Sequence, residues 1–312
     1  MKFHAWTLLI FLALLGFEAE AQAFPRARDG HPDFSGAWTS SFITPLERMP
    51  GATGLRVSEA EAKALGQKMF DAYVARENGL DPDVLAADTR NLLRIGNEYR
   101  TSLVVEPADG KVPLTAEGLK LIAKARQEMP NLPDDPEARP EWDRCITGAG
   151  RAPLALTPTI NARQIVQTHD SLALYTEDGP DLRIISIGGQ HRPAAVAMWG
   201  GDSTATWEGD TLVIETVNQR GMLRVGVTYG FIVRPEAKVI ERLKFLSPDE
   251  ILYSYTVLDP KFYSAPWRVE FTFTRSKVAA TEYGCHEGNY ALVNMLHSAR
   301  FEQRRAEAVS GR

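Results

Sequence analysis

A succession of short segments, each alternating apolar and polar residues, constrains the fold of this chain most strongly. The segments fill its C-terminal half and are separated by turn-forming pairs such as Asp178-Gly179, Gly209-Asp210 and Asp259-Pro260. Alternation of this kind gives a strand one dry face and one wet face. No helical pattern long enough for a crossover lies between the segments, so they predict an antiparallel meander. The expected strands are Gln164–Thr176, Leu182–Ile187, Ala205–Trp207, Thr211–Thr216, Val227–Val233, Val239–Phe245, Ile251–Leu258, Arg268–Thr274 and Thr281–Gly284.

A meander of this many strands removes its exposed edges by closing on itself. Gly36-Ala37-Trp38 lies in an earlier expected strand, Asp33–Thr39. Barrels of the lipocalin type often begin with Gly-x-Trp, whose indole closes the barrel floor against a late arginine, and Arg275 is available here. The alternative is an ordinary core tryptophan. We therefore expect a mainly β protein with helical additions (α+β), in which an antiparallel meander closes into a calycin- or lipocalin-like barrel.

The N-terminal half carries the helical patterns. Ser58 and Glu61 form a capping box at the start of one helix, for which Gly79 is the expected stop. A second helix is expected from Thr115 to just before Pro130, and a last one over residues 290–303. A short strand is expected over residues 101–106. We expect residues 24–150 to form an irregular, helical segment that wraps the barrel, and residues 151–312 to form the barrel and its C-terminal helix, together as one compact unit.

The first residues have the pattern of a cleavable leader. Lys2 precedes an apolar run over Trp6–Phe17, and Ala21-Gln22-Ala23 is a small-x-small cleavage site. The run is shorter than the ~20 residues that span a bilayer. We expect residues 1–23 to be a signal peptide cut after Ala23, which leaves a periplasmic or secreted chain without a membrane anchor; an uncleaved membrane anchor is the alternative.

Export affects how the two cysteines are interpreted. Cys145 and Cys285 form an even count in an oxidising compartment, which favours a disulfide. A catalytic thiol is the alternative because His286 follows Cys285 directly. Neighbours on a strand point in opposite directions, however, so this pair is a poor nucleophile and base.

Charge and motif content exclude several function classes. The chain has 35 Lys and Arg against 40 Asp and Glu, a net charge of −5, and no basic cluster interleaved with aromatic residues. A nucleic-acid partner is therefore not expected. His169, His191, His286 and His297 lack metal-ligand spacing, and no nucleotide-binding glycine motif or Gly-x-Ser-x-Gly elbow is present. We expect neither a metal nor a cofactor.

Candidate catalytic groups occur in the strand-rich half. His191 lies in a glycine-flanked loop, where it is either an acid/base residue or a solvated surface histidine. Glu241 and Arg242 are adjacent within an apolar strand, so one of them should face inward. That residue would then serve a ligand or form a buried salt bridge. Tyr253 and Tyr255 share one face of the next strand and could line the same cavity.

A second group of candidates lies near the expected disulfide. His286 and Glu287 form a possible acid/base pair, although the same residues could form only a structural corner that caps a helix. Arg100, Asp202 and Trp199 are candidates for contacts with a ligand at the barrel rim.

Six segments, in the same order, resemble a large family of uncharacterised secreted bacterial proteins found in soil and aquatic species. The family signature is Trp-x-Gly-Asp-Ser-x(3)-Trp-Glu-Gly-Asp-Thr-Leu-Val-x-Glu-Thr, followed later by Cys-His-Glu-Gly-Asn-Tyr. The chain departs from the pattern at His169-Asp170 and at Ile187–Gln190. The resemblance implies export and the fold and does not imply a reaction. The matching segments are residues 33–38, 100–110, 164–168, 199–218, 259–260 with 266–267, and 283–290.

These observations favour an enzyme that acts on a small, partly aromatic molecule by metal-independent acid/base chemistry, as a lyase more than a hydrolase, on substrates such as lignin-derived phenolics. The alternative is a non-catalytic carrier that uses the same barrel cavity. The oligomeric state stays open, a homodimer included. The candidate catalytic residues are His191, Glu241, His286 and Glu287, and the candidate binding residues are Arg100, Arg242, Tyr253, Tyr255, Trp199 and Asp202.

Overall fold

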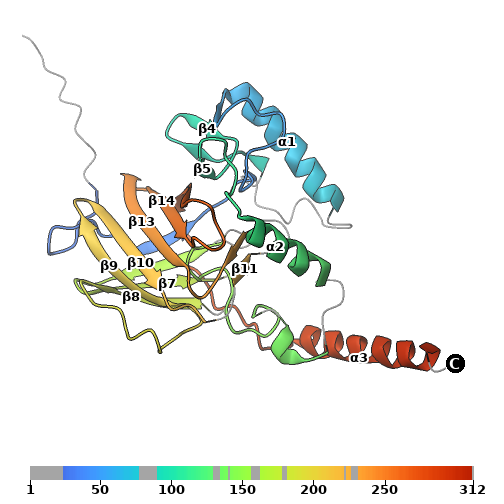
Figure 1. Ribbon diagram of the computed structural model, residues 1–312. Helices are drawn as coiled ribbons and strands as arrows, with labels where there is room; N and C mark the ends of the chain where they lie inside the picture. The colour runs from blue at the N-terminus through green and yellow to red at the C-terminus, as the bar shows by residue number, and fades with distance from the viewer. Residues whose placement is uncertain are drawn as a thin grey trace, which may run out of the picture.

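A closed β-barrel with helices on one side of it forms this molecule (Figure 1). The computed structural model describes residues 24–76, 90–128, 134–139, 141–155, 162–177, 181–220, 223–225 and 231–310. The expected signal peptide and the expected helix stop at Gly79 lie outside these residues. Nine strands close the barrel in the order β1-β6-β7-β8-β9-β10-β13-β14-β15, and β1 returns to pair with β15. Their bounds are β1 Gly36–Thr39, β6 Arg163–Gln167, β7 Ser171–Thr176, β8 Asp181–Ile187, β9 Asp202–Glu208, β10 Thr211–Val217, β13 Lys238–Ser247, β14 Glu250–Leu258 and β15 Trp267–Arg275.

The remaining elements lie around this barrel. A small three-stranded sheet, in the order β2-β4-β3, lies next to α1, and β5 adds to the barrel sheet at β15. Strands β11 and β12 form a separate hairpin. These elements are β2 Arg56–Val57, α1 Glu59–Arg76, β3 Arg94–Ile95, β4 Glu98–Arg100, β5 Val104–Glu106, α2 Ala116–Glu128, a 3-10 helix η4 Pro136–Ala138, β11 Leu223–Val225, β12 Phe231–Val233 and α3 Tyr290–Ser310.

The strand that closes the barrel comes from the N-terminal part of the chain. In β1, Trp38 pairs with Arg275 of β15, and the same strand pairs with β6 on its other side. Trp38 is fully buried, and the guanidinium carbon of Arg275 lies 4.3 Å from the centre of its ring. Gly36 has a φ of +142°, and a Cβ there would lie 2.7 Å from Nη1 of Arg275, so a side chain would displace the arginine. The Gly-x-Trp prediction, with Arg275 as its partner, is confirmed.

One strand pair departs from the expected antiparallel pattern. β8 and β9 are parallel, with Ser186 opposite Thr204 and Ile187 opposite Ala205. Parallel neighbours need a crossover connection, because the chain must return to the same end of the sheet. Residues 188–201 make that crossover over the outside of the barrel and carry His191 with them.

Two of the expected strands differ from the structure. Gln164–Thr176 is not one strand: it is divided into β6 and β7 by a turn in which the Thr168 hydroxyl contacts the Asp170 carboxylate at 2.8 Å. Thr281–Gly284 forms no strand. Of Val227–Val233, only the part in β12 falls within the described residues. The other expected segments of the C-terminal half lie in strands.

Aromatic side chains fill the barrel where β14 and β15 face inward. Tyr253, Tyr255, Phe271 and Phe273 are each 3% exposed or less and belong to one continuous core. The segment before β6 brings its backbone to them, and the Leu154 N–H donates to the Tyr253 hydroxyl at 2.9 Å. Tyr253 and Tyr255 therefore share the inward face, as expected, and they pack there against other side chains.

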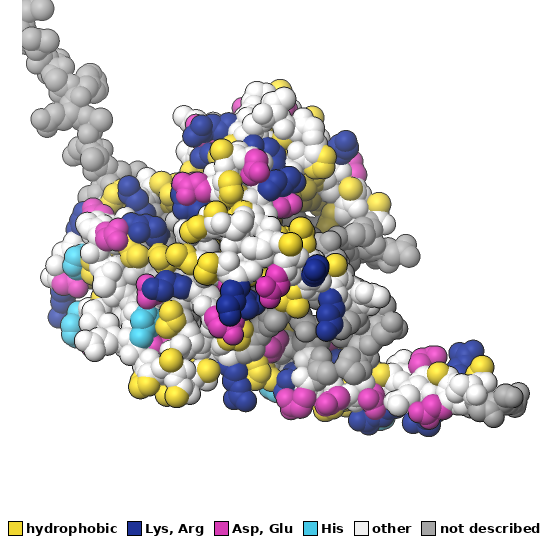
Figure 2. Space-filling view, viewed as in Figure 1, with side chains coloured by type: hydrophobic (Ala, Val, Ile, Leu, Met, Phe, Trp, Pro, Cys, Tyr) yellow, Lys and Arg dark blue, Asp and Glu magenta, His cyan; other side chains and the backbone are white. Residues whose placement is uncertain are grey.

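The helices begin where the sequence predicts. The Ser58 hydroxyl accepts from the Glu61 N–H at 3.3 Å before α1, and the Thr115 hydroxyl accepts from the Gly118 N–H at 3.1 Å before α2. Helix α3 runs further than residue 303 and extends away from the body, with acidic and basic side chains interspersed along it (Figures 1 and 2). Within the described part of the chain, no helix combines the length and apolar character that crossing a membrane requires.

Cys145 and Cys285 form the expected disulfide, with their Cα atoms 5.7 Å apart. Neither of the two cysteines in the sequence is a free thiol, so the structure does not support the alternative of a catalytic thiol.

Candidate functional site

Inside the barrel, Arg183 and Glu241 form a buried ion pair. Two Arg183 nitrogens donate to the two Glu241 oxygens at 3.0 and 2.6 Å, and the Tyr253 hydroxyl donates to Glu241 at 2.7 Å. Arg183 also donates to the hydroxyls of Ser203 and Thr216, each at 3.2 Å. We call these five residues the inner network. Its bidentate geometry satisfies the Glu241 carboxylate from two sides, as a buried charge requires.

Burial shapes the protonation of this network. It raises the pKa of the Tyr253 hydroxyl well above its ordinary value, and the nearby Glu241 carboxylate raises it further. Burial alone would lower the pKa of Arg183, but the charge and hydrogen bonds of Glu241, with smaller contributions from Tyr253 and Asp181, together outweigh burial, and the net shift of the pKa is upward. The Arg183 guanidinium is therefore held charged and the Tyr253 phenol neutral. Glu241 takes the inward position and forms a buried salt bridge, while Arg242 points outward and pairs with Glu208 of β9, across the intervening strand β10.

His191 lies on the opposite, outer face of the same wall. Its Nδ1 is 3.0 Å from Asp202 Oδ2, and its Nε2 is 3.2 Å from the Thr204 hydroxyl and 3.3 Å from Glu215 Oε1. The other Glu215 oxygen accepts from Lys238 Nζ at 3.0 Å. We call these five residues the outer cluster. It joins the crossover loop to three adjacent strands, β9, β10 and β13.

The backbone positions the Asp202 side chain. Gly201 has a φ of +77°, and a Cβ there would lie 2.6 Å from Cγ2 of Thr216, so only glycine brings the loop this close to β10. The Asp202 carboxylate also accepts from the Arg192 N–H at 2.7 Å. With its side chain 8% exposed, Asp202 is held firmly, whereas the His191 side chain is 26% exposed.

This geometry makes His191 suited to proton transfer. Asp202 and Glu215 are both acceptors, so the ring can donate from Nδ1 to Asp202 and from Nε2 to Glu215, whereas the Thr204 hydroxyl can donate to an Nε2 that carries no proton. A histidine ring held between two carboxylates can take part in acid/base chemistry. The predicted ligand-binding residue Asp202 therefore has a different place: it orients His191.

The disulfide corner lies apart from both groups. His286 and Glu287 are exposed beside Cys285. Asn289 donates to the Cys145 sulfur at 3.2 Å, and its side-chain oxygen accepts from the Leu292 N–H at 3.4 Å. The contacts of this segment are those of a helix cap on a disulfide-bonded corner. The structure thus brings His191 together with Asp202, and it does not bring His191, Glu241 and His286 into one pocket.

The other predicted binding residues are dispersed. Arg100 is buried in β4 and pairs with Glu98 at 3.1 Å, and burial lowers the pKa of its guanidinium. The guanidinium carbon of Arg220 lies 5.2 Å from the ring centre of Trp199, which is on the same loop as His191. Tyr255 packs edge-on against Trp267 inside the barrel.

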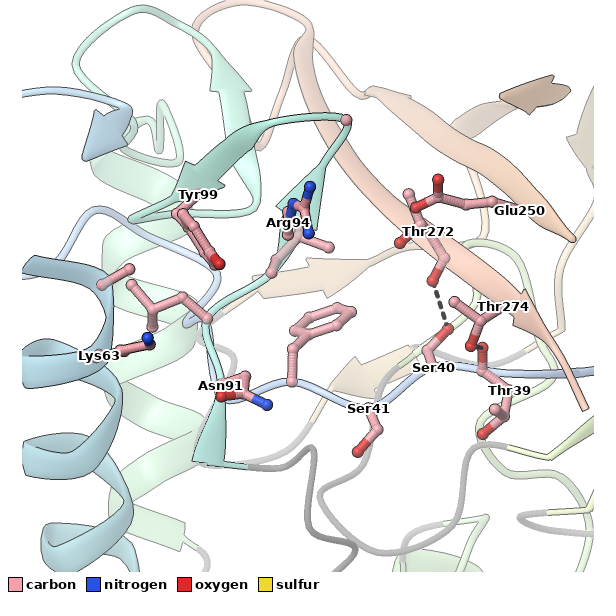
Figure 3. A pocket seen from close by; sticks show the side chains of 15 residues that line it. Thr39, Ser40, Ser41, Lys63, Asn91, Arg94, Tyr99, Glu250, Thr272 and Thr274 are labelled. Carbon is pink, nitrogen blue, oxygen red and sulfur yellow. Dashed lines mark hydrogen bonds between the residues drawn. The ribbon is translucent and has the colours of Figure 1, made fainter. Parts of the chain in front are cut away.

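A cleft of about 540 Å³ lies between the outer wall of the barrel and the unit formed by α1, β3 and β4 (Figure 3). The barrel contributes hydroxyl groups from the ends of β1 and β15, and the opposite side contributes Lys63, Asn91, Arg94 and Tyr99. Phe42 and Leu92 add apolar surface. A cleft of this size can hold a small organic molecule.

Glu250 gives the cleft an ionisable group. It lies on β14 on the barrel side, and burial raises the pKa of its carboxyl, an effect that a Thr272 hydrogen bond and the charge of Arg94 partly offset. A carboxyl with a raised pKa in a cleft is a common feature of functional sites. Among the described residues, no group of three or more His, Cys, Asp and Glu side chains could hold a metal ion.

The sequence analysis missed Arg183, Glu215 and Glu250. For Glu215 the available signal was its outward position in the alternating strand 211–217, where a carboxylate can reach the neighbouring strands. Comparisons with protein-family models, with curated proteins and with solved structures find no match.

Proposed function

We propose that this protein is a secreted, periplasmic enzyme that cleaves a small, partly aromatic molecule by metal-independent acid/base chemistry, as a lyase more than a hydrolase. The observation that supports it is the 3.0 Å contact between a buried carboxylate, Asp202, and Nδ1 of a partly exposed imidazole, His191. A partly exposed histidine whose ring is oriented by a buried carboxylate is a common arrangement for a general base. Trp199, on the same loop, is a partly exposed aromatic side chain with Arg220 over its ring, and it could contact an aromatic substrate.

In the proposed lyase reaction, His191 Nε2 removes a proton from a carbon of the substrate. The electron pair of that C–H bond forms a new double bond, and the leaving group departs with the electrons of its own bond. The imidazolium then returns the proton to the leaving group. Asp202 keeps the ring oriented throughout, and Glu215 stabilises the charged intermediate form of His191.

The test uses the mature chain and a panel of aromatic ethers and hydroxycinnamoyl esters, with products followed by chromatography. His191→Ala should lower kcat by about 10²- to 10⁴-fold and leave the substrate affinity close to that of the wild type. His169→Ala is the matched control, because His169 is 81% exposed on the turn between β6 and β7. If His191→Ala converts the substrate at the wild-type rate, the catalytic assignment is wrong.

A non-catalytic carrier is the second candidate, because the cleft in Figure 3 has room for a small molecule and its lining contains no residue of the outer cluster. A carrier would bind its ligand without forming a product, and His191→Ala would only weaken or spare that binding. The carrier alternative gains no support from the aromatic residues inside the barrel, since they are in contact with one another.

The periplasmic location is supported by the disulfide, which is typical of oxidising compartments. Expression of the full sequence in a bacterial host, followed by mass spectrometry of the periplasmic fraction, should find an N-terminus at Phe24. An intact Met1 on the recovered protein contradicts this part of the proposal.

A further inference from the structure

The two sides of the cleft differ in their chemistry (Figure 3). Five hydroxyl side chains form what we call the hydroxyl wall, on the barrel side: Thr39, Ser40, Ser41, Thr272 and Thr274. Facing it, Lys63, Asn91, Arg94 and Tyr99 form what we call the cationic wall, which belongs to α1, β3, β4 and the segment before β3. A ligand that fits must therefore carry different groups on its two edges.

The hydroxyl wall presents hydrogen-bond acceptors. The Ser40 hydroxyl donates to the Thr272 carbonyl at 2.9 Å, and the Thr274 hydroxyl donates to the Thr39 carbonyl at 3.4 Å. A hydroxyl has one donor and two acceptor positions, so these groups retain acceptor capacity toward the cleft. Glu250, on the same side, adds carboxyl oxygens. A ligand rich in hydroxyl donors satisfies this wall, whereas a flat aromatic ring would leave it without partners.

The cationic wall presents donors and positive charge. Arg94 uses one described hydrogen bond, to Asn97 at 2.9 Å, and a guanidinium has five N–H donors. Lys63 brings a second cation, and its contact with Glu59 at 2.8 Å leaves the ammonium with further donors. Since Glu59 already pairs with Lys63, Arg94 is the cation of this wall for which no ion pair is found among the described residues. A planar guanidinium binds a carboxylate through two parallel hydrogen bonds, which favours a ligand with a carboxylate on this edge.

Apolar surface lies between the two walls. Phe42 and Leu92 line the cleft, and the ring of Tyr99 lies with its centre 6.0 Å from the guanidinium carbon of Arg94. Such a surface packs against the C–H face of a sugar ring. An inorganic anion would make no apolar contact with it and would fill only a small part of the cleft, whose volume is about 540 Å³.

We propose that this cleft binds an acidic sugar, namely a uronic acid or a short oligosaccharide that contains one. Its carboxylate is held by Arg94 and Lys63, its hydroxyls by the hydroxyl wall and Glu250, and its ring face by Tyr99 and Phe42. The site is separate from the outer cluster, since it lies against β1, β14 and β15 instead of β9, β10 and β13.

The test is isothermal titration calorimetry of the mature chain with three probes: digalacturonate, the neutral disaccharide galactobiose, and 4-hydroxybenzoate. Digalacturonate should bind at least about tenfold more tightly than either of the others. Equal or tighter binding of galactobiose overturns the role of the cations, and tighter binding of 4-hydroxybenzoate overturns the assignment to a sugar. Absence of digalacturonate binding at millimolar concentration overturns the proposal as a whole.

Variants locate the binding. Arg94→Gln should weaken digalacturonate about tenfold and leave galactobiose unchanged, and Thr274→Val should weaken both sugars. Lys68→Gln, on the same helix as Lys63 and outside the cleft lining, is the control for Lys63→Gln. Circular dichroism checks that each variant is folded. Unchanged affinity in folded Arg94→Gln and Lys63→Gln overturns the site. His191→Ala should bind digalacturonate like the wild type, so this result does not depend on the proposed enzyme activity.

Discussion

Glu215 and Thr216 are neighbours on β10, yet they belong to different groups. Thr216 points inward to the Arg183 guanidinium of the inner network, and Glu215 points outward to His191 and Lys238 of the outer cluster. Both groups contain a carboxylate and a cation. In the inner network the pair is almost without exposure, and in the outer cluster Glu215 and Lys238 are 36% and 44% exposed. The difference indicates that the inner carboxylate stabilises the fold, while the outer one is open to solvent and can contact a ligand.

The largest effect should come from breaking the inner ion pair. Glu241→Gln leaves the buried Arg183 charge without its carboxylate and should lower the free energy of unfolding by about 3–5 kcal/mol. Glu215→Gln, in the neighbouring strand, should cost less than about 1 kcal/mol. Urea unfolding followed by tryptophan fluorescence measures both. Equal losses would show that the two groups do not differ as described.

A second variant tests why the loss is large. Replacing both partners, Arg183→Met with Glu241→Leu, removes the buried charges together and should regain part of the stability lost in Glu241→Gln. No gain over the single variant would mean that the hydrogen bonds to Tyr253 and Thr216, rather than the unpaired charge, dominate.

The next effect concerns the disulfide that fixes the segment leading into the barrel. Cys145→Ser with Cys285→Ser opens a link across 140 residues and should cost about 2–5 kcal/mol. Because Leu154 follows this link and donates to Tyr253, the loss should also increase hydrogen exchange at the Leu154 amide. Exchange at the Ala205 amide of β9, on the far wall, serves as the control. Equal changes at the two amides would contradict a local effect.

The barrel was predictable, and the meeting of His191 with Asp202 was not. The alternation along the strands is a local signal, and so is the Gly-x-Trp pattern of Gly36 and Trp38. The structure contains the strands, and it places Trp38 against Arg275. The contact between His191 and Asp202 depends on a crossover between parallel strands, and nothing in residues 188–201 has the length or periodicity of a typical crossover helix.

The sequence analysis did not decide whether Glu241 or Arg242 faces inward, although the strand sequence contains a signal that favours Glu241. Lys244 lies two residues after Arg242 on β13, so the two side chains share one face of the strand. Two cations on one face indicate that this face is the one exposed to solvent. The cleft had no comparable signal. Lys63, Arg94 and Thr272 are far apart in the sequence, and only the packing of α1 and β3 against the barrel brings them together.

Breaking an ion pair of intermediate exposure, that of Arg234 and Asp259, should lower the free energy of unfolding by an intermediate amount. Arg234 donates to both Asp259 oxygens at 2.7 and 2.6 Å, with the Asp259 side chain 2% and the Arg234 side chain 15% exposed. Burial alone would raise the pKa of Asp259, but the hydrogen bonds and charge of Arg234, together with the backbone N–H groups of Lys261 and Phe262, outweigh burial, and the pKa lies below the ordinary value of 3.8. Asp259→Asn should cost about 1.5–3 kcal/mol at pH 7.

The sign of the pH dependence follows from that shift. A carboxyl with a lowered pKa in the folded state stabilises the fold above its unfolded pKa, and this stabilisation is lost as the pH falls through the folded value. The stability difference between the wild type and Asp259→Asn should therefore shrink as the pH falls below about 3.8. Asp249→Asn is the control. The Asp249 carboxylate pairs with Arg275 but is 78% exposed, so this substitution should change the stability little at any pH. A difference that grows on acidification has the wrong sign for this pair.

The smallest effect on stability should come from Lys238→Gln. Its contact with Glu215 is half exposed, so the loss should be below about 1 kcal/mol and should disappear in high salt. The same change leaves Glu215 with His191 as its remaining described ionic partner. In the proposed enzyme Glu215 then contacts His191 without the competing cation, so kcat should change by more than it does in the His169→Ala control. A variant that keeps its stability and changes kcat supports a role of the outer cluster in the reaction. A variant that loses as much stability as Glu241→Gln removes the distinction between the two faces of the wall.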